Sequence, residues 1–289
     1  MSTLISAAEP PIAKIAPKKI EVNGDTRVDN YFWLRDDARK DPEVLKYLEA
    51  ENTYTESIFK GTEGLQKKLY DELIGRIKQT DENVPVRRGD YFYYMRTVEG
   101  KQYPINCRKN GSLSAAEEVL VDQNALATGE KYFRIGAYQP SPSQQLLAFT
   151  VDTEGDEVYT LVVKDLKTGK MLTDQVRGVY YSLAWANDNK TLFYNVLDAA
   201  KRPYKIFRHS LGTDAKADVE VFHEKDERFE AEVAKTKSGE YLLIDSNSKI
   251  TSEVLYLKAD QPQGSFQVLL LRKEGVEYGA VHHGKDFFV

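Results

Sequence analysis

The sequence predicts a mostly β protein made of four-stranded β-propeller blades, preceded by an N-terminal helical segment. Three observations predict this fold. Similar runs begin at Phe133, Tyr181, Phe229 and Val276, at spacings of 48, 48 and 47 residues. Each run is followed by a polar turn and a more hydrophobic strand, and two further strands complete the earlier units. Four strands repeating every 46–55 residues or so are typical of propeller blades, whereas a β-sandwich need not repeat at one fixed period.

Residues 1–30 are expected to form an extended leader. They contain Pro10, Pro11 and Pro17 and show little hydrophobic periodicity. The apolar stretch Leu4–Ala8 is too short for the hydrophobic core of a signal peptide, and no charged region precedes it. We therefore expect a flexible leader in a cytoplasmic protein.

Residues 31–79 are expected to be helical. Asp41 is a favourable N-cap and Pro42 suits the first helical position. Apolar residues then recur at roughly helical spacing until Gly61 closes the segment: Val44, Leu48, Tyr54 and Ile58. A second helix carries a narrow apolar stripe of residues four apart: Leu65, Leu69, Leu73 and Ile77. These helices must be covered, so they either cap the β region or clasp a domain that is missing from this chain.

Residues 80–289 read as short alternating strands separated by polar turns. The second strand of each unit is the most hydrophobic: Tyr91–Met95, Leu146–Val151, Leu192–Val196, Tyr241–Ile244 and Phe287–Val289. Third strands are expected at Tyr103, Val158, Tyr204 and Val254, and fourth strands near Glu118, Met171, Val219 and Phe266. The last unit has only its first strand and the start of its second. We therefore expect four whole blades and a truncated one, in an architecture that normally closes into a ring.

Composition excludes several classes of protein. Lysine and arginine number 40 against 45 aspartates and glutamates, which leaves a net charge of −5. A nucleic-acid binder would need a basic face, so no nucleic-acid partner is expected. No apolar run reaches about 18 residues, so no membrane partner is expected either. The single Cys107 excludes an intramolecular disulfide and is expected to be an ordinary packed or edge cysteine in a reducing compartment.

The sequence lacks the motifs of the common catalytic sites. A nucleophile elbow needs G-x-S-x-G, and the one pair of glycines four apart, Gly275 and Gly279, has Glu277 at the nucleophile position. The four histidines show no metal-binding spacing: His209, His223, His282 and His283. His282 and His283 should point to opposite faces of a strand, which is poor for chelation. We therefore assign no catalytic residue, no cofactor and no metal site to the chain.

The densest charge cluster is DTEGDE, from Asp152 to Glu157, between a second and a third strand. The cluster either solvates a hairpin tip, binds a cation or a basic peptide, or contacts a partner domain. The EF-hand pattern fails because strand residues occupy its later positions. Asp156 and Glu157 are the candidates for an interdomain or gating contact, together with Arg202 in the segment RPYKIFRH, which reads as a rim cation or as plain surface.

Several segments carry a resemblance to a known family. DNYFWLRD at residues 29–36, followed by DPEVLKYLEAENTYTE at 41–56, resembles the signature opening of the prolyl oligopeptidase family. GKQYPINCRK at 100–109, DTEGDEVYTLVVKDLKTG at 152–169 and TSEVLYLKAD at 251–260 are similar to its oligopeptidase B branch. The resemblance runs from about residue 10 to the end of the chain.

This resemblance implies both a partner and an activity for the complete enzyme. In the family, the N-terminal helical segment packs on a C-terminal α/β-hydrolase domain, and a seven-bladed propeller covers the active site. The enzymes cleave short peptides, in this branch after Arg or Lys, with a Ser–Asp–His triad that lies in the C-terminal domain. We therefore expect this chain to gate access and to dock the hydrolase domain, and to be inactive alone. The alternative is a stand-alone propeller that acts as a binding module without peptidase activity.

Overall fold

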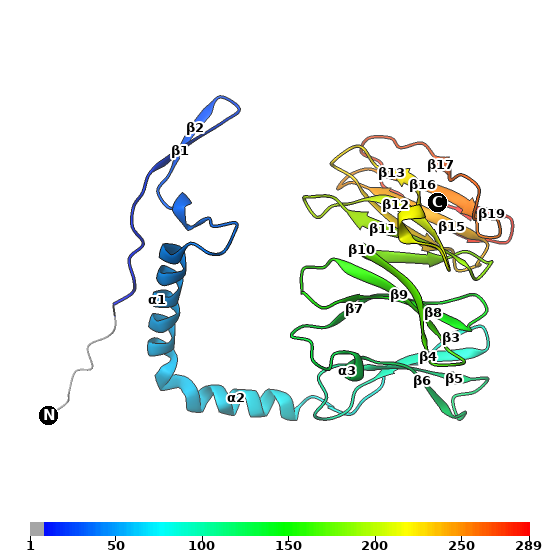
Figure 1. The fold of residues 1–289 in the computed structure, drawn as a ribbon, viewed down its shortest axis with the longest axis horizontal. Coiled ribbons are helices and arrows are strands. Elements are labelled where there is room, and N and C mark those ends of the chain that lie inside the picture. Colours follow the sequence, from blue (N-terminus) through cyan, green and yellow to red (C-terminus); the bar gives the residue numbers. More distant parts are fainter. Residues whose placement is uncertain (1–8) are drawn as a thin grey trace. The chain divides into compact units, whose positions relative to one another are not determined.

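The structure is a computed structural model that describes residues 9–289, and the chain divides into two compact units, residues 1–78 and 79–289 (Figure 1). Residues 1–8, which belong to the expected leader, lie outside the described residues. We describe each unit by itself. No helix within residues 9–289 combines the length and the apolar character needed to cross a bilayer.

The N-terminal unit begins with a β-hairpin that the sequence analysis did not expect. Strands β1 (Lys18–Val22) and β2 (Asp25–Asp29) pair in antiparallel register. The turn between them is Asn23–Gly24, and both residues have positive φ, 53° and 83°. Asn-Gly is the preferred pair for such a turn because both central positions need a left-handed backbone. The range expected to be an extended leader therefore contains a paired hairpin.

Two helices follow, as the capping and periodicity predict. After the short 3₁₀ turn η1 (Phe32–Leu34), helix α1 spans Pro42–Phe59, and the Asp41 side chain accepts hydrogen bonds from the backbone N–H groups of Glu43 and Val44. A second 3₁₀ turn, η2 (Lys60–Thr62), leads into helix α2 (Glu63–Gly75). Ile77 lies beyond the end of α2, so its expected place on that helix was wrong.

Little of the N-terminal unit is buried. Among residues 9–78, Val44 is the one hydrophobic residue that is buried. The indole of Trp33 packs edge-on against Tyr47, with ring centroids 5.8 Å apart, and donates a hydrogen bond to the carbonyl oxygen of Lys14. The apolar stripe is about half exposed or more at every position: Leu65, Leu69, Leu73 and Ile77. This unit therefore has a large apolar surface that it does not cover itself.

The second unit consists of propeller blades, as predicted from the 48-residue period. Blade 1 contains β3 (Val86–Arg88), β4 (Tyr91–Arg96), β5 (Ile105–Asn110) and β6 (Glu117–Asp122). A short helix, α3 (Gln123–Leu126), leads to blade 2, which contains β7 (Arg134–Pro140), β8 (Leu146–Asp152), β9 (Tyr159–Asp165) and the first part of β10 (Met171–Trp185). Blade 3 contains the rest of β10, β11 (Thr191–Leu197), β12 (Pro203–Ser210) and, after the 3₁₀ turn η3 (Ala215–Ala217), β13 (Val219–His223).

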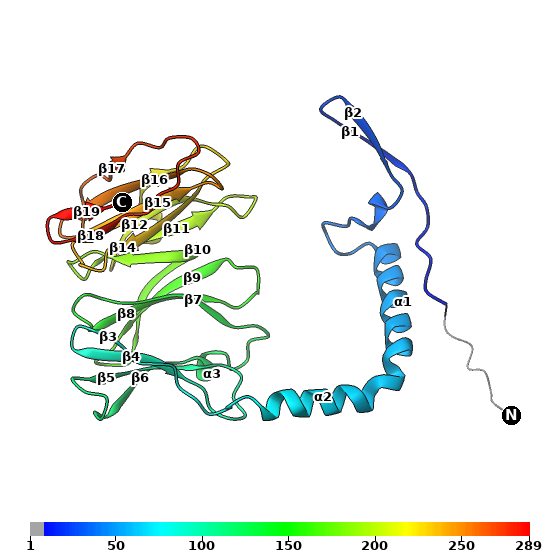
Figure 2. The same ribbon diagram turned by 180° about the vertical axis from the view of Figure 1, so that it is seen from behind.

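Blade 4 contains β14 (Glu230–Lys235), β15 (Tyr241–Asn247), β16 (Ser252–Lys258) and β17 (Gln267–Leu270). A hairpin of β18 (Val281–His283) and β19 (Asp286–Phe288) follows it, and the sheets do not close into a ring (Figure 2). The expected first strand of this last unit was placed too early at Val276. Residues 271–280 are irregular, with Gly275 at a φ of 74°, and the strand begins only at Val281.

Strand β10 joins two blades without a loop. Its first part pairs with β9 and its second part pairs with β11, so blades 2 and 3 form one seven-stranded sheet. The ladder is irregular around Gly178, which has a φ of 82° that an L side chain rarely adopts. The glycine therefore marks the position where the fourth strand of blade 2 becomes the first strand of blade 3.

The hydrophobic core lies between neighbouring blades. One cluster joins blades 1 and 2 through residues such as Leu120 and Phe149, and another joins blades 2 and 3 through Leu161 and Trp185. The largest cluster joins blades 3 and 4, where Phe193 and Leu242 are fully buried. Each blade therefore has its stabilising contacts mainly with the next, which is the behaviour of a repeat protein.

Candidate functional site

The candidate residues lie at one end of the blades. Successive strands of a blade are antiparallel, so the loop between the second and third strands lies at the same end as the connection to the next blade. The β8–β9 loop carries Asp156 and Glu157, and the β11–β12 loop carries Arg202. We call this end the loop face. The chain order of the blades can be followed in Figure 1.

The β8–β9 loop is organised by a buried carboxylate. Asp152 is 1% exposed, and its side chain accepts hydrogen bonds from the backbone N–H groups of Glu154, Gly155 and Glu157, at 2.9, 2.8 and 3.0 Å. Gly155 and Glu157 both have positive φ, 80° and 63°. Asp152 is thus a structural group, and no set of three or more acidic, histidine or cysteine side chains within residues 9–289 is arranged to hold a metal ion.

Asp156 and Glu157 each meet a cation from a neighbouring segment. Lys201 Nζ lies 3.4 Å from an Asp156 carboxylate oxygen and donates to the Asp156 backbone oxygen at 3.0 Å. Arg134 lies 3.2 Å from Glu157, to which the Tyr181 hydroxyl also donates a hydrogen bond. Both acidic side chains are about half exposed, so each ion pair is worth only about 0–1 kcal/mol. A partner could therefore compete for these carboxylates at little cost.

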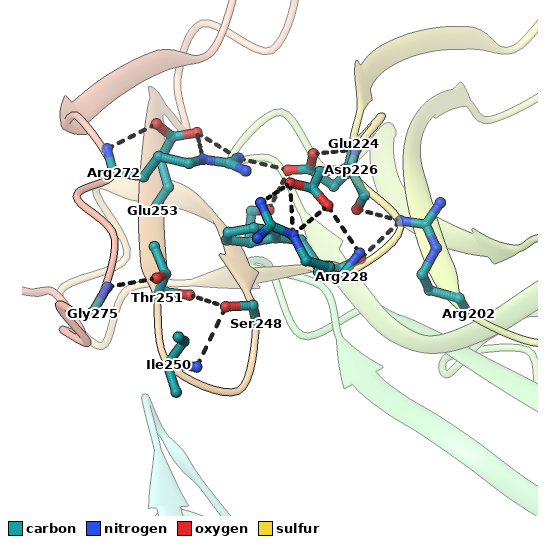
Figure 3. Close-up of polar contacts among 12 residues, drawn as sticks. Arg202, Glu224, Asp226, Arg228, Ser248, Ile250, Thr251, Glu253, Arg272 and Gly275 are labelled. Carbon is teal, nitrogen blue, oxygen red and sulfur yellow. Dashed lines mark hydrogen bonds and ion pairs between the residues drawn. The ribbon is translucent and has the colours of Figure 1, made fainter. Parts of the chain in front are cut away.

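In contrast to the two acidic side chains, the Arg202 side chain is largely buried and bonds other residues of the propeller. Its side chain is 14% exposed and bonds the Asp198 carboxylate at 2.9 Å. It also donates to the backbone oxygens of Asp226 and Phe229, in the connection between blades 3 and 4, at 3.2 and 2.8 Å. Figure 3 shows Arg202 beside Asp226. Arg202 thus fixes one loop of the loop face to the next blade connection.

Asp226 and Phe229, which Arg202 contacts, also line a cavity that the sequence analysis did not predict. It has a volume of about 510 Å³ and a mostly apolar lining from three segments of the chain. Its lining residues are Asp226, Glu227, Arg228, Phe229, Ser248, Lys249, Ile250, Thr251, Arg272 and Glu274. We call it the blade 4 cavity, because all three segments border blade 4. Its segments contain the strings KDER, SKIT and RKEG, which lie in separate connections between strands and carry no shared sequence signal.

Two arginines in this cavity are held by carboxylates (Figure 3). Arg272 bonds Glu224 at 2.6 Å and Glu253 at 2.9 Å, and its guanidinium lies 4.1 Å from the centre of the Phe229 ring. Burial raises the pKa of Glu224, but hydrogen bonds from Arg272 and Ser246 outweigh it, so the net shift is downward.

Arg228 has a more exposed environment. It bonds the Asp226 carboxylate at 2.7 Å, and this side-chain hydrogen bond holds the pKa of Asp226 at about 2. The side chain of Arg228 is 73% exposed, in contrast to 29% for Arg272. The cavity thus has one partly buried arginine and one solvated arginine, and each has its own acidic partners.

The other polar residues singled out by the sequence have structural roles. Cys107 is buried in β5, and burial raises the pKa of its thiol to about 12, as expected for a packed cysteine. His209 is buried between Asp174 and Asp218. His282 is buried and His283 is exposed, as their adjacent positions on a strand predict. Cys107, His209 and His282 are therefore buried parts of the fold.

Ser238 and His282 are hydrogen-bonded and have the residue types of a catalytic serine–histidine pair. The Ser238 hydroxyl lies 2.9 Å from Nδ1 of His282, and the Glu240 carboxylate lies 4.0 Å from the same nitrogen. In a catalytic triad the base meets the nucleophile through one ring nitrogen and the carboxylate through the other. Ser238 is also hydrogen-bonded to Thr236 at 2.9 Å. This arrangement is not a triad.

The described residues thus define a β-propeller domain with a rim of ion pairs and a mostly apolar cavity beside blade 4. Comparison with known proteins agrees with this class. The family model for the prolyl oligopeptidase N-terminal β-propeller domain matches residues 10–289. The chain therefore belongs to the prolyl oligopeptidase family, as a representative of its N-terminal propeller part.

Individual relatives to which the chain is similar include an oligopeptidase B. The chain is 35% identical to "Protease 2" of Moraxella lacunata, over 96% of this chain and 41% of the relative. It is 39% identical to "Dipeptidyl aminopeptidase BI" of Pseudoxanthomonas mexicana, over all of this chain and 42% of the relative. The solved oligopeptidase B of Leishmania major superposes with a TM-score of 0.88 at 34% identity, over 96% of this chain and 42% of that structure. The chain thus spans about two fifths of the length of these relatives.

Proposed function

We propose that this chain is the gating and docking part of a serine oligopeptidase of the oligopeptidase B type, which cleaves short peptides after Arg or Lys in the cytoplasm. The observation that carries the proposal is the match to oligopeptidase B over 96% of this chain but only 42% of that structure. A propeller without a nucleophile elbow would contribute to peptide cleavage only together with a catalytic domain. That partner, a C-terminal α/β-hydrolase domain, would cover the apolar stripe of Leu65, Leu69 and Leu73.

The first test concerns catalysis by the chain alone. We expect no labelling by a fluorophosphonate serine probe and no hydrolysis of arginyl or lysyl amides, because the described residues 9–289 contain no preorganised acyl-transfer site. Protease 2 of Moraxella lacunata serves as the positive control, under the same conditions. Covalent labelling of a serine within residues 1–289 would overturn the proposal and favour a catalytic role for this chain.

A second candidate activity is favoured by the 39% identity to a dipeptidyl aminopeptidase. The two activities differ in whether the substrate needs a free N-terminus. An acetylated arginyl amide is cleaved by an oligopeptidase of the first kind, and a free dipeptidyl amide is required by the second. Assay of the complete two-domain enzyme with both substrates decides between them. Absence of both activities would favour the remaining alternative, a propeller that acts only as a binding module.

Asp156 and Glu157 are proposed to face the hydrolase domain. They lie on an ordered loop, are half exposed, and have cationic partners that a docking surface can displace. Changing Asp156→Asn and Glu157→Gln together in the complete enzyme is expected to alter the salt dependence of kcat/KM, because the attraction between these half-exposed carboxylates and a basic docking surface is screened by salt. Glu154→Gln in the same loop is the matched control. Unchanged kinetics and an unchanged salt response would leave only a solvated hairpin.

A further inference from the structure

The blade 4 cavity has a lining suited to an apolar side chain. Its accessible apolar lining comes from Ile250, which is 56% exposed, because the Phe229 ring is only 3% exposed and lies under the Arg272 guanidinium. The methylene stems of Arg228 and Arg272 add apolar surface, because arginine can cover apolar groups while its head stays polar. A concave site of about 510 Å³ is large enough for one or two amino-acid side chains.

The charges around the cavity favour a cation beside that apolar group. Among the residues that line it, and those whose side chains bond to them, five are acidic and four are basic: Glu224, Asp226, Glu227, Glu253 and Glu274 against Arg202, Arg228, Lys249 and Arg272. The three arginines are already paired with carboxylates. Within residues 9–289, the exposed side chains of Glu227 and Glu274 form no ion pair or hydrogen bond. They are therefore available to a ligand.

We propose that the blade 4 cavity binds a peptide segment in which an Arg or Lys side chain stands next to an apolar one. The apolar side chain packs on Ile250 and on the methylene stems of the two arginines, and the cationic side chain lies against Glu227 and Glu274. The proposal rests on the proposed function for the nature of the ligand, a peptide, and adds a substrate contact on the propeller. The cavity opens between connections at the loop face. Arg202 links one of these connections, at Asp226 and Phe229, to the β11–β12 loop.

The experiment measures binding of capped dipeptides to this chain by isothermal titration calorimetry. Acetyl-Phe-Arg-amide is expected to bind with a dissociation constant of about 0.1–1 mM, as suits a small and partly exposed site. Acetyl-Phe-Glu-amide and acetyl-Gly-Arg-amide are each expected to bind at least about fivefold more weakly, since one lacks the cation and the other lacks the apolar group. Added salt should weaken the first interaction, because exposed charges are screened.

Substitutions of residues in the cavity test whether the peptide binds there. Glu227→Lys combined with Glu274→Lys is expected to weaken binding of acetyl-Phe-Arg-amide about tenfold, and Ile250→Asp to weaken it by a similar factor. Glu99→Lys combined with Glu130→Lys makes the same change in net charge at exposed sites outside the cavity and should leave binding unchanged. Circular dichroism checks that each variant is folded.

Equal binding of the three peptides, tighter binding of the acidic one, or equal effects of the two double variants would overturn the proposal. Because hydrolysis is not measured, such a result would leave the proposed peptidase function intact. That function fails separately, if the complete enzyme does not cleave basic peptides.

Discussion

Replacing Arg272 by alanine is expected to lower the free energy of unfolding of the propeller by about 3–5 kcal/mol. Its two partners, Glu224 and Glu253, have side chains that are only 6% and 12% exposed. Without the guanidinium, two neighbouring and largely buried carboxylates would lose their cation and keep only hydrogen bonds from Ser246 and from backbone N–H groups, and the Phe229 ring would lose the group stacked on it. Urea unfolding followed by circular dichroism measures the loss.

Arg228 is a matched control in the same cavity. Its side chain is 73% exposed and its single partner is Asp226, so Arg228→Ala is expected to cost about 0–1 kcal/mol. Arg272→Lys should fall between the two alanine variants, because an ammonium group cannot reproduce the planar, multiply bonded geometry of a guanidinium. Equal losses for Arg272→Ala and Arg228→Ala would contradict the assignment of Arg272 as the arginine that pairs with buried carboxylates.

The pH dependence of this effect has a definite sign. The folded-state pKa of Glu224 is lowered, so its contribution to stability is present above its unfolded value, near 4.5, and is lost as the pH falls through the folded value. In the Arg272→Ala variant the same carboxyl has no cation to offset burial. Protonation then relieves the variant as the pH falls towards the unfolded value, and the wild type loses its own contribution below that value, so the difference should shrink as the pH falls through about 4.5.

The blades were predictable because their signal is periodic and local. A hydrophobic second strand after each polar turn recurs about every 48 residues, and pairing of neighbouring strands follows from short connections. Glu224 and Arg272 are themselves 48 residues apart, so the ion pair joins equivalent places in successive repeats. The first strand of the last unit was misplaced because the Gly275 turn extends the irregular connection beyond the expected position.

The roles of charged residues were much harder to predict. DTEGDE contains four carboxylates of similar appearance, yet Asp152 is buried and holds the loop while Asp156 and Glu157 are exposed. Arg202 likewise reads as surface but bonds two backbone oxygens of the next connection. Burial depends on contacts between separate loops, and residue type alone does not specify it. The blade 4 cavity was missed for the same reason, because three separate segments form it.

The largest contrast is expected in the exchange of backbone amide hydrogens. In this chain alone, helices α1 and α2 should exchange at least about 10³-fold faster than strands β8 and β11. Leu147, Phe149, Leu192 and Phe193 in those strands are fully buried, whereas Val44 is the one buried hydrophobic residue in the N-terminal unit among residues 9–78. Helices of this length are only marginally stable without packing, so they should open often.

The complete enzyme provides the decisive comparison. Covering Leu65, Leu69 and Leu73 with a hydrolase domain would stabilise each side chain by roughly 1.5–3 kcal/mol if burial were complete. Hydrogen–deuterium exchange detected by mass spectrometry, on this chain alone and on the complete enzyme, therefore tests the docking role most directly. We predict fast exchange in α1 and α2 of the isolated chain and strong slowing of both helices in the complete enzyme. Helices as well protected as β8 and β11 in the chain alone, or helices that stay unprotected in the complete enzyme, would contradict it.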